Sequence, residues 1–430
     1  MSGSPGTGRR KSAGAEGRMT RRGFLAAAAA TTAAAAVVPR HVLGGAYAPP
    51  SETLAVGIVG CGGQSGEDVR NYIGGAGGKY TVLAVCDVDK HRMARSVKSH
   101  GPSCEGYTDF RRLVERADLD VVSVATPPHW HALVTIAAMQ AGKDVLCEKP
   151  MTKFIAEGRA VVKAGQRYGR VFQIGTSGRF GAYRSSRSRQ IHKIMRSGLL
   201  KDCKGVWIQR GEFHIKQYCG MVGPAPQAVP PHLDWDMYCG PARLAPYHPH
   251  RFGWSHRYYW DYEGQGLADF AQHYLDPIQW VYGKDDTSPV EIEAYAPPAH
   301  PDAAGMWGWV EMTYADGMTF VFDGREWGKP YDRKQARHVE LEDLDEASRK
   351  KVEAMPDPEP PRTFVEAVRT RKRSAGHAEA AHRAATVLHL ANIAIRCGRK
   401  IRYDPVTEQI LGDEFANRLV NQPMRAPWHI

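Results

Sequence analysis

The sequence lacks the features that mark several common protein classes. Its eight cysteines include no Cys-x-x-Cys pair and no Cys/His arrangement at zinc spacing, so we expect no metal site. No block of Lys and Arg interleaved with aromatic residues is present, so we expect no nucleic-acid partner. An uncharged, alanine-rich run at residues 25–38 is shorter than the roughly 20 residues that a membrane-spanning helix needs.

The composition that is present belongs to a folded protein. Charged residues make up 24% and hydrophobic residues 43% of the 430 residues, which is ordinary globular usage. At roughly 100 to 200 residues per domain, this length predicts two or three domains. The net charge of +11 is concentrated at the start, where the first fifty residues hold seven basic residues and one glutamate. The basic excess therefore belongs mainly to a leader.

That leader has the order of a twin-arginine signal. Arg21 and Arg22 precede the alanine-rich run, and small residues follow it. Cleavage after Ala46-Tyr47-Ala48 and cleavage after Val42-Leu43-Gly44 both remain open. We expect residues 1–48 to be a signal peptide and leader, the twin-arginine export machinery to be a partner, and the mature protein to be periplasmic.

A glycine-rich turn follows the first predicted strand. The apolar run 54–59 leads directly into Gly60, Cys61, Gly62, Gly63 and Gln64. Gly60 permits a tight turn, and Gly62 lets the backbone approach a pyrophosphate at the start of the next helix. Ser65 stands where the fingerprint usually has a third glycine, so the loop is slightly irregular. We interpret this turn as a dinucleotide-binding loop.

An acidic residue ends the second predicted strand. Asp87 follows the apolar run 80–86, about 20 residues beyond the loop, where a carboxylate accepts hydrogen bonds from the adenosine ribose. This carboxylate repels the 2′-phosphate of NADP, although Lys90 and Arg92 nearby act in the opposite direction. We expect NAD as the cofactor, with NADP less favoured.

Strand and helix patterns alternate as far as residue 174. Further strands are predicted at residues 120–125, 144–147 and 170–174. This spacing implies a parallel, doubly wound sheet whose ligand crevice lies at the carboxyl ends of its strands. Two groups of candidate cofactor-binding residues follow such strand ends: Thr126, Pro127, His129 and His131 in the first, and Glu148 and Lys149 in the second.

Four motifs in this order resemble one known family. They are Gly60-Cys61-Gly62, Thr126-Pro127-Pro128-His129-Trp130-His131, Glu148-Lys149-Pro150 and Asp269-Phe270-Ala271-Gln272-His273-Tyr274-Leu275-Asp276. Together they look like the Gfo/Idh/MocA oxidoreductases, the glucose-fructose oxidoreductase and inositol dehydrogenase family, in its exported bacterial branch. The resemblance implies an α/β protein with an NAD(P)-binding Rossmann domain at residues 49–175. It also implies a substrate-binding α+β domain with an open, largely antiparallel sheet at 176–400 and a C-terminal arm at 401–430.

The last motif places polar residues on one helix face. Asp269, His273 and Asp276 recur at helical spacing beside an apolar stripe, which is typical of a helix that lines a cleft. Asp269 would orient His273, whose ordinary pKa near 6.5 suits proton transfer. The structural alternative is that Asp269 caps the helix and His273 is a half-buried core histidine. Pro277 follows Asp276 directly, so a substrate contact from Asp276 is the least secure role.

Lys149 is the third candidate catalytic residue. The resemblance implies that its ammonium group binds the reacting hydroxyl and stabilises the developing alkoxide. The peptide bond to Pro150 can be cis, which would turn the lysine into the crevice. A lysine at the surface end of a strand is the alternative.

An aromatic-rich insertion is expected at residues 207–262. Twelve of its 56 residues are aromatic, a density that argues against disorder. Because sugar rings stack on aromatic faces, the insertion could cover the substrate, with Trp260 and Tyr262 as candidate contacts. An interface in a homo-oligomer is the alternative, since Tyr and Trp are also enriched there.

These observations favour an enzyme that transfers a hydride from a sugar, glycoside or cyclitol hydroxyl. No NAD(H) pool exists outside the cytoplasm, so we expect the cofactor to be tightly bound and recycled on the protein. A redox-neutral NAD-dependent glycosidase or epimerase is one alternative, and a non-catalytic carbohydrate-binding protein is another. Fold class by itself does not decide between them.

Replacing Asp87 with alanine tests the cofactor assignment. We expect Asp87→Ala to weaken binding of NAD more than that of NADP, because only NAD has a free 2′-hydroxyl for the carboxylate. Titration of both nucleotides into the stripped protein measures the two losses. An equal loss for both would contradict the ribose contact.

Overall fold

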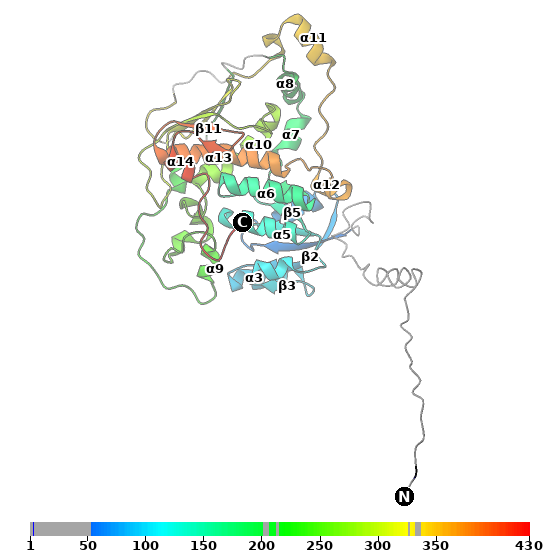
Figure 1. The fold of residues 1–430 in the computed structure, drawn as a ribbon, viewed down its shortest axis with the longest axis vertical. Helices are drawn as coiled ribbons and strands as arrows, with labels where there is room; N and C mark the ends of the chain where they lie inside the picture. The colour runs from blue at the N-terminus through cyan, green and yellow to red at the C-terminus, as the bar shows by residue number, and fades with distance from the viewer. Residues whose placement is uncertain (1–2, 4–52, 201–205, 212–214, 326, 332–336) are drawn as a thin grey trace. The chain divides into compact units, whose positions relative to one another are not determined.

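The computed structural model describes residue 3 and residues 53–200, 206–211, 215–325, 327–331 and 337–430 (Figure 1). The leader expected at residues 1–48 lies outside the described residues apart from residue 3. No helix in the described part of the chain is long and apolar enough to cross a membrane.

A six-stranded parallel sheet forms the N-terminal half in the order β3-β2-β1-β4-β5-β6. Its strands are β1 (Thr53–Val59), β2 (Lys79–Cys86), β3 (Glu105–Tyr107), β4 (Val121–Val124), β5 (Asp144–Cys147) and β6 (Phe172–Ile174). Every residue of β4, β5 and β6 is buried, as expected for a parallel sheet that is covered on both faces. The predicted doubly wound sheet is confirmed.

Helices from both ends of the chain cover this sheet. On one face lie α4 (Phe110–Val114), α5 (His131–Gln140) and α6 (Ile155–Tyr168), which share a core with β4 and β5. On the other face, α12 (Phe364–Thr370) buries Phe364 and Val365 against Val56 and Ile58 of β1. The helix α3 (Lys90–His100) follows β2, with Asp89 as its N-cap.

A second six-stranded sheet follows in the order β12-β11-β8-β9-β10-β7. Only β7 and β10 pair in parallel, and the other pairs are antiparallel, so the expected open, largely antiparallel sheet is confirmed. Its strands are β7 (Trp207–Arg210), β8 (Glu291–Tyr295), β9 (Trp309–Thr313), β10 (Thr319–Asp323), β11 (Ile401–Asp404) and β12 (Gln409–Ile410). The C-terminal residues expected as an arm therefore include two strands, because Ile401, Tyr403 and Ile410 are buried in the core of this sheet.

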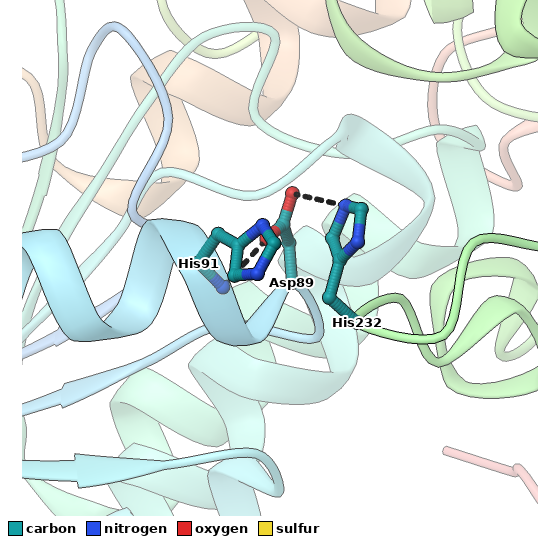
Figure 2. A group of neighbouring side chains, drawn as sticks. All are labelled: Asp89, His91 and His232. Carbon is teal, nitrogen blue, oxygen red and sulfur yellow. Dashed lines mark hydrogen bonds and ion pairs between the residues drawn. The ribbon is translucent and has the colours of Figure 1, made fainter.

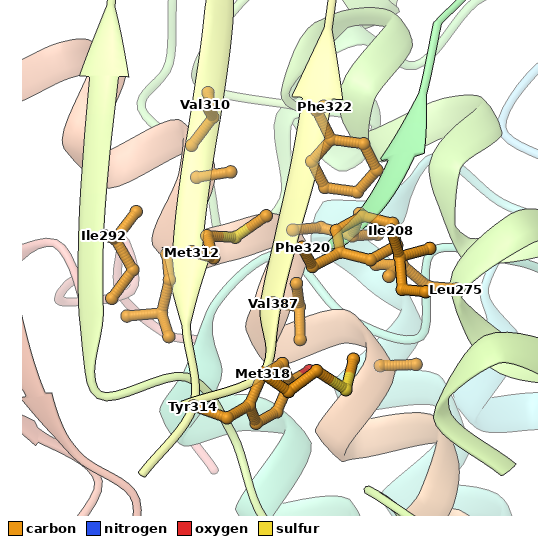
Figure 3. Packing of buried hydrophobic residues seen from close by; sticks show 14 of the residues in the cluster. Ile208, Leu275, Ile292, Val310, Met312, Tyr314, Met318, Phe320, Phe322 and Val387 are labelled. Carbon is orange, nitrogen blue, oxygen red and sulfur yellow. The ribbon is translucent and has the colours of Figure 1, made fainter. Parts of the chain in front are cut away.

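Two long helices pack against one face of the second sheet. Figure 3 shows side chains of β8, β9 and β10 meeting Leu275 of α10 (Gln265–Val281) and Val387 of α13 (Ala378–Cys397). All residues from Ala380 to Ile395 of α13 are buried, because this helix contacts α6 on one side and α10 and β8 on the other. Its many alanines allow this close approach, and it joins the two sheets (Figure 1).

A buried ionic network anchors the middle of α10. Arg179 of α7 (Gly178–Arg184) donates its Nε–H to Asp276 at 2.7 Å and pairs with Asp285 at 2.7 Å. The hydroxyl of Thr176 donates to the same Asp276 carboxylate at 2.7 Å. Asp276 is completely buried, and Pro277 follows it inside the helix. Asp276 thus joins α10 to the segment that enters the second domain.

One variant tests how much this ionic network contributes to the free energy of unfolding. We expect Asp276→Asn to lower the free energy of unfolding by about 2 kcal/mol, because a buried guanidinium loses a charged hydrogen-bond partner. The exposed pair of Arg196 and Asp286, at 3.5 Å, supplies the control, and Asp286→Asn should cost less than about 0.5 kcal/mol. Denaturant unfolding measures both variants. Equal losses would show that the network does not stabilise the fold.

Candidate active site

A cavity of about 790 Å³ opens at the carboxyl ends of the parallel strands. The glycine loop and Asp87 line one part of it, and Lys149, Asp269 and His273 line another. The remaining wall comes from the insertion, including Met237, Tyr238, Phe252, Trp254 and Arg257. This position agrees with the crevice predicted from the order of the strands.

The glycine loop is shaped as a close-approach turn. Gly60 has a φ of 97°, and an added Cβ would lie 2.5 Å from the carbonyl oxygen of Ala125. A Cβ at Gly62 would meet no atom nearer than 3.9 Å, and one at Gly63 would meet none within 4 Å. Both glycines therefore leave open space beside the backbone. The following helix is short: α2 (Glu67–Val69) continues only as a π-helical turn to Gly74.

Asp87 organises the same end of the cavity. One carboxylate oxygen accepts the backbone N–H of Cys61 at 2.7 Å, and the other accepts that of Asp89 at 2.8 Å. Burial raises the pKa of Asp87, while these two N–H groups lower it. Arg92 and Arg95 also line this region of the cavity. Of the residues predicted here, Asp87 and Arg92 thus line the cavity, whereas Lys90 is not part of its lining.

The cavity wall contains an unsatisfied polar group. The Thr126 hydroxyl is buried and has no hydrogen-bond partner among the described residues. Thr126 and Pro127 follow β4 and line the cavity next to the glycine loop. A buried hydroxyl without a hydrogen-bond partner is typical of a position where a bound ligand supplies that partner.

Lys149 and Asp269 form a buried ion pair. Lys149 Nζ lies 2.6 Å from Asp269 Oδ1, and the two side chains are 8% and 2% exposed. Arg257 Nε lies 3.1 Å from the same oxygen, and the Tyr218 hydroxyl donates to Oδ2 at 3.3 Å. Burial acts to raise the pKa of Asp269, but Lys149 and Arg257 outweigh it and hold that pKa below its ordinary value. Asp269 is therefore a carboxylate that holds Lys149 in the cavity.

This arrangement corrects the expected role of Asp269. The residue lies inside α10 and does not cap it, and its carboxylate is bound by Lys149, Arg257 and Tyr218 rather than by His273. The two residues are one helical turn apart on α10, and the Asp269 carboxylate contacts two cations and a hydroxyl. The Lys149–Pro150 peptide bond is cis.

His273 faces the open cavity one turn along α10 from Asp269. Desolvation by the cavity walls lowers the pKa of His273 to about 4, and the charge of Lys149 acts in the same direction. The imidazole is therefore neutral near pH 7 and has a lone pair that can accept a proton.

Other candidate residues lie outside the cavity lining. His129 and His131 are buried at the start of α5, where their ring nitrogens contact the carbonyl oxygens of Tyr238, Pro150 and Thr126. They hold neighbouring loops together. Among the substrate candidates, Asp276 is in the Arg179 network, Trp260 donates to the His300 carbonyl at 2.9 Å, and Tyr262 is fully buried.

Sequence reasoning missed several residues of the cavity. Arg257 stacks on Trp254 at 4.0 Å, and Trp254 and Phe270 remain 59% and 39% exposed. The aromatic density of residues 207–262 marked the segment, but no local signal identified which of its residues reach the cavity. Asp68, which lies behind the cavity wall against Glu148, was also missed, and burial together with this second carboxyl raises its pKa.

Both halves of the chain match models of one family. Residues 54–176 match the model described as the oxidoreductase family, NAD-binding Rossmann fold. Residues 185–430 match the model described as the oxidoreductase family, C-terminal alpha/beta domain. The chain belongs to the Gfo/Idh/MocA oxidoreductase family. The family resemblance expected from the four motifs is therefore confirmed.

Named relatives of this Gfo/Idh/MocA protein match over part of its length. Inositol 2-dehydrogenase from Salmonella typhimurium is 33% identical over 129 residues, which are 30% of this chain and 38% of that protein. A glycosyl hydrolase family 109 protein from Solibacter usitatus is 32% identical over 125 residues, or 27% of this chain and 28% of that protein. The chain thus spans well under half the length of each relative.

Solved structures agree with the family fold over a longer region. The WlbA dehydrogenase from Chromobacterium violaceum, in complex with NADH and UDP-GlcNAcA, has a TM-score of 0.56 at 16% identity. The match covers 83% of this chain and 99% of that one. The WlbA dehydrogenase from Bordetella pertussis has a TM-score of 0.54 at 15% identity, covering 82% and 99%. At this identity the likeness concerns the fold alone.

The influence of Lys149 on His273 is open to direct measurement. We expect Lys149→Met to raise the pKa of His273 from about 4 toward its ordinary value, because the variant removes a nearby positive charge. Titration of the imidazole by NMR measures this change, with His273→Gln used to assign the signal. His100, at the end of α3, has a pKa that burial lowers, and it is the internal control whose pKa should be the same in both proteins. An unchanged pKa of His273 would contradict the electrostatic contact.

Proposed function

We propose that this protein is an NAD-dependent oxidoreductase that acts on a hydroxyl group of a sugar, glycoside or cyclitol. The observation that carries the proposal is one cavity that is lined by the glycine loop and Asp87 as well as by Lys149 and His273. A cation and a neutral base suit the deprotonation of an alcohol. A glycine loop with an acidic strand end suits a dinucleotide.

The cavity residues fit a nicotinamide dinucleotide. The open space beside Gly62 and Gly63 leaves room for a pyrophosphate. The Asp87 carboxylate, held by two backbone N–H groups, is oriented at the ribose end, and the Thr126 hydroxyl has no partner among the described residues. The residues that would hold the cofactor are Gly60, Cys61, Gly62, Gly63, Gln64, Asp87, Thr126, Pro127 and Glu148, while Lys149 lines the cavity on the side of the reacting hydroxyl. When bound, NAD supplies the acceptor for a hydride from the carbinol carbon.

His273 and Lys149 divide the proton chemistry between them. The neutral imidazole of His273 accepts the proton of the substrate hydroxyl. The ammonium group of Lys149 stabilises the negative charge that develops on the same oxygen. Asp269 acts through Lys149, which it holds at 2.6 Å, and is a positioning residue.

The insertion supports tight retention of the cofactor. The backbone N–H of Lys90 donates to the His232 carbonyl at 2.9 Å, and that of Asp234 donates to the Val88 carbonyl at 3.0 Å. These bonds hold the insertion against the segment that follows Asp87. Tyr238 and Phe252 of the insertion line the cavity and pack together with ring centroids 5.0 Å apart. A dinucleotide at Asp87 would then be covered by protein and released slowly.

The substrate class rests on the aromatic mouth of the cavity. Trp254 and Phe270 present exposed ring surface there, and Tyr218 lies within 6.5 Å of the first ring and 6.0 Å of the second. Sugar rings stack on such surfaces. Curated relatives named inositol 2-dehydrogenase are consistent with a polyhydroxylated ring as the substrate.

We further propose export through the twin-arginine pathway to the periplasm, on the basis of the leader at residues 1–48. In that compartment a released reduced cofactor would not be replaced. The bound cofactor must then be restored either by a second hydride-accepting substrate or within a single substrate that is oxidised and reduced again. The second route would give redox-neutral glycosidase or epimerase chemistry, as the relative named for glycosyl hydrolase family 109 also suggests.

The proposal is tested by turnover without added cofactor. We expect the purified protein to carry NAD(H) and to convert sugars or glycosides while no free NADH accumulates, because the cofactor stays bound. Mass spectrometry measures the conversion of sugars or glycosides, and the absorbance of the filtrate measures free NADH. Lys149→Ala and His273→Ala should each lower the turnover rate about 100-fold or more, and both variants should retain the cofactor.

His429→Ala, at an exposed histidine remote in sequence, is the control and should keep full turnover. Strict dependence on added NAD, with free NADH formed in proportion to product, would contradict cofactor retention. Loss of bound cofactor in both active-site variants would contradict their assignment to the substrate hydroxyl.

A further inference from the structure

Three metal-ligating side chains meet where the insertion touches the first domain. Asp89 caps α3, His91 lies in the first turn of that helix, and His232 comes from the insertion. One ligand atom of each residue lies within 4.8 Å of those of the other two. Figure 2 shows the two imidazoles side by side next to the carboxylate, and their ring centroids are 4.1 Å apart. We propose that Asp89, His91 and His232 bind a divalent transition-metal ion of the zinc type.

The carboxylate has one oxygen that a metal can use. Asp89 Oδ1 accepts the backbone N–H groups of His91 and Arg92, at 2.8 and 3.1 Å. Oδ2 lies 4.0 Å from His232 Nε2, which is too long for a hydrogen bond. In a tetrahedral zinc site with bonds of about 2.0 Å, two ligand atoms lie about 3.3 Å apart. The distance between Asp89 Oδ2 and His232 Nε2 therefore needs to shorten by less than about 1 Å.

The backbone holds the segments of Asp89 and His232 next to each other before a metal binds. Asp89 and Leu233 form an antiparallel bridge, flanked by the bonds from Lys90 to His232 and from Asp234 to Val88. His91 is exposed, so its ring is free to rotate out of the stack until a nitrogen faces Oδ2. Three protein ligands leave the fourth position of a tetrahedral ion to water.

The ligand chemistry selects the class of ion. Two imidazoles and one carboxylate favour Zn²⁺, Ni²⁺ or Cu²⁺, whereas Mg²⁺ and Ca²⁺ prefer oxygen ligands throughout. Arg92 Nε lies 3.5 Å from Asp89 Oδ2, and its guanidinium stacks on Phe252 at 4.5 Å. A bound metal ion would replace Arg92 as the positive charge that faces the Asp89 carboxylate. The sequence alone did not predict this group of ligands, because 141 positions separate His91 from His232.

The position of the site gives it a consequence for the cavity. The backbone N–H of Asp89 donates to Asp87, which lines the cavity, and His232 belongs to the insertion that covers the same end. A metal ion coordinated by both segments would clip the insertion to the domain that carries the glycine loop. Release of a bound dinucleotide would then require the clip to open.

The test uses the full chain without a histidine tag, treated with EDTA and then dialysed. We expect titration calorimetry with Zn²⁺ to show one site per chain and Mg²⁺ to show none. His91→Ala, His232→Ala and Asp89→Asn should each weaken Zn²⁺ binding by about tenfold or more. His100→Ala, at the other end of α3, is the matched control and should bind as the unchanged protein does.

Hydrogen exchange supplies a readout that does not depend on activity. Zn²⁺ should slow exchange of the amides of Lys90 and Asp234, which join the two segments, and should have no such effect in His232→Ala. Absence of stoichiometric Zn²⁺ binding would overturn the proposal. So would equal affinity in the unchanged protein and the three variants, because the ion would then be bound elsewhere.

Discussion

The buried ion pair of Lys149 and Asp269 is the contact on which the geometry of the cavity depends. Lys149 follows β5 of the first sheet, whereas Asp269 lies on α10, which packs beneath the second sheet. Removing two charges from water costs several kcal/mol unless other polar groups compensate. Arg257 and Tyr218 supply that compensation, and both come from the insertion. One cluster of charges in the cavity wall therefore joins both domains and the insertion.

The same cluster explains why Asp269 and His273, one turn apart on α10, differ in charge. Asp269 is surrounded by cations and keeps its negative charge, while His273 lies one turn away and is kept neutral by desolvation and by Lys149. Lys149 thus acts on both residues: together with Arg257 it keeps Asp269 charged, and together with desolvation it keeps His273 neutral. The arrangement requires no direct bond between the two residues.

Local sequence patterns predicted the parts of the fold that depend on local physics. The strand runs, the glycine turn with its left-handed Gly60, and the single face of α10 follow from periodicity and backbone freedom. The partners of Asp269 did not follow, because Lys149 is 120 positions away and the competition between its ammonium group and an imidazole is settled only by folding. The burial of Asp276 depends likewise on a distant arginine, Arg179. The aromatic density located the insertion but could not separate Trp254 at the cavity from Trp260 in the packed interior.

The helix α12 has a consequence for the order in which the chain folds. Phe364 and Val365 of this helix share a core with Val56 and Ile58 of β1, although more than 300 residues separate them from that strand. During synthesis, this part of the core therefore stays incomplete until almost the whole protein has left the ribosome, although Val69 and Ile73 already pack on the same face. A chain that stops before residue 364 would lack the two side chains that complete this core.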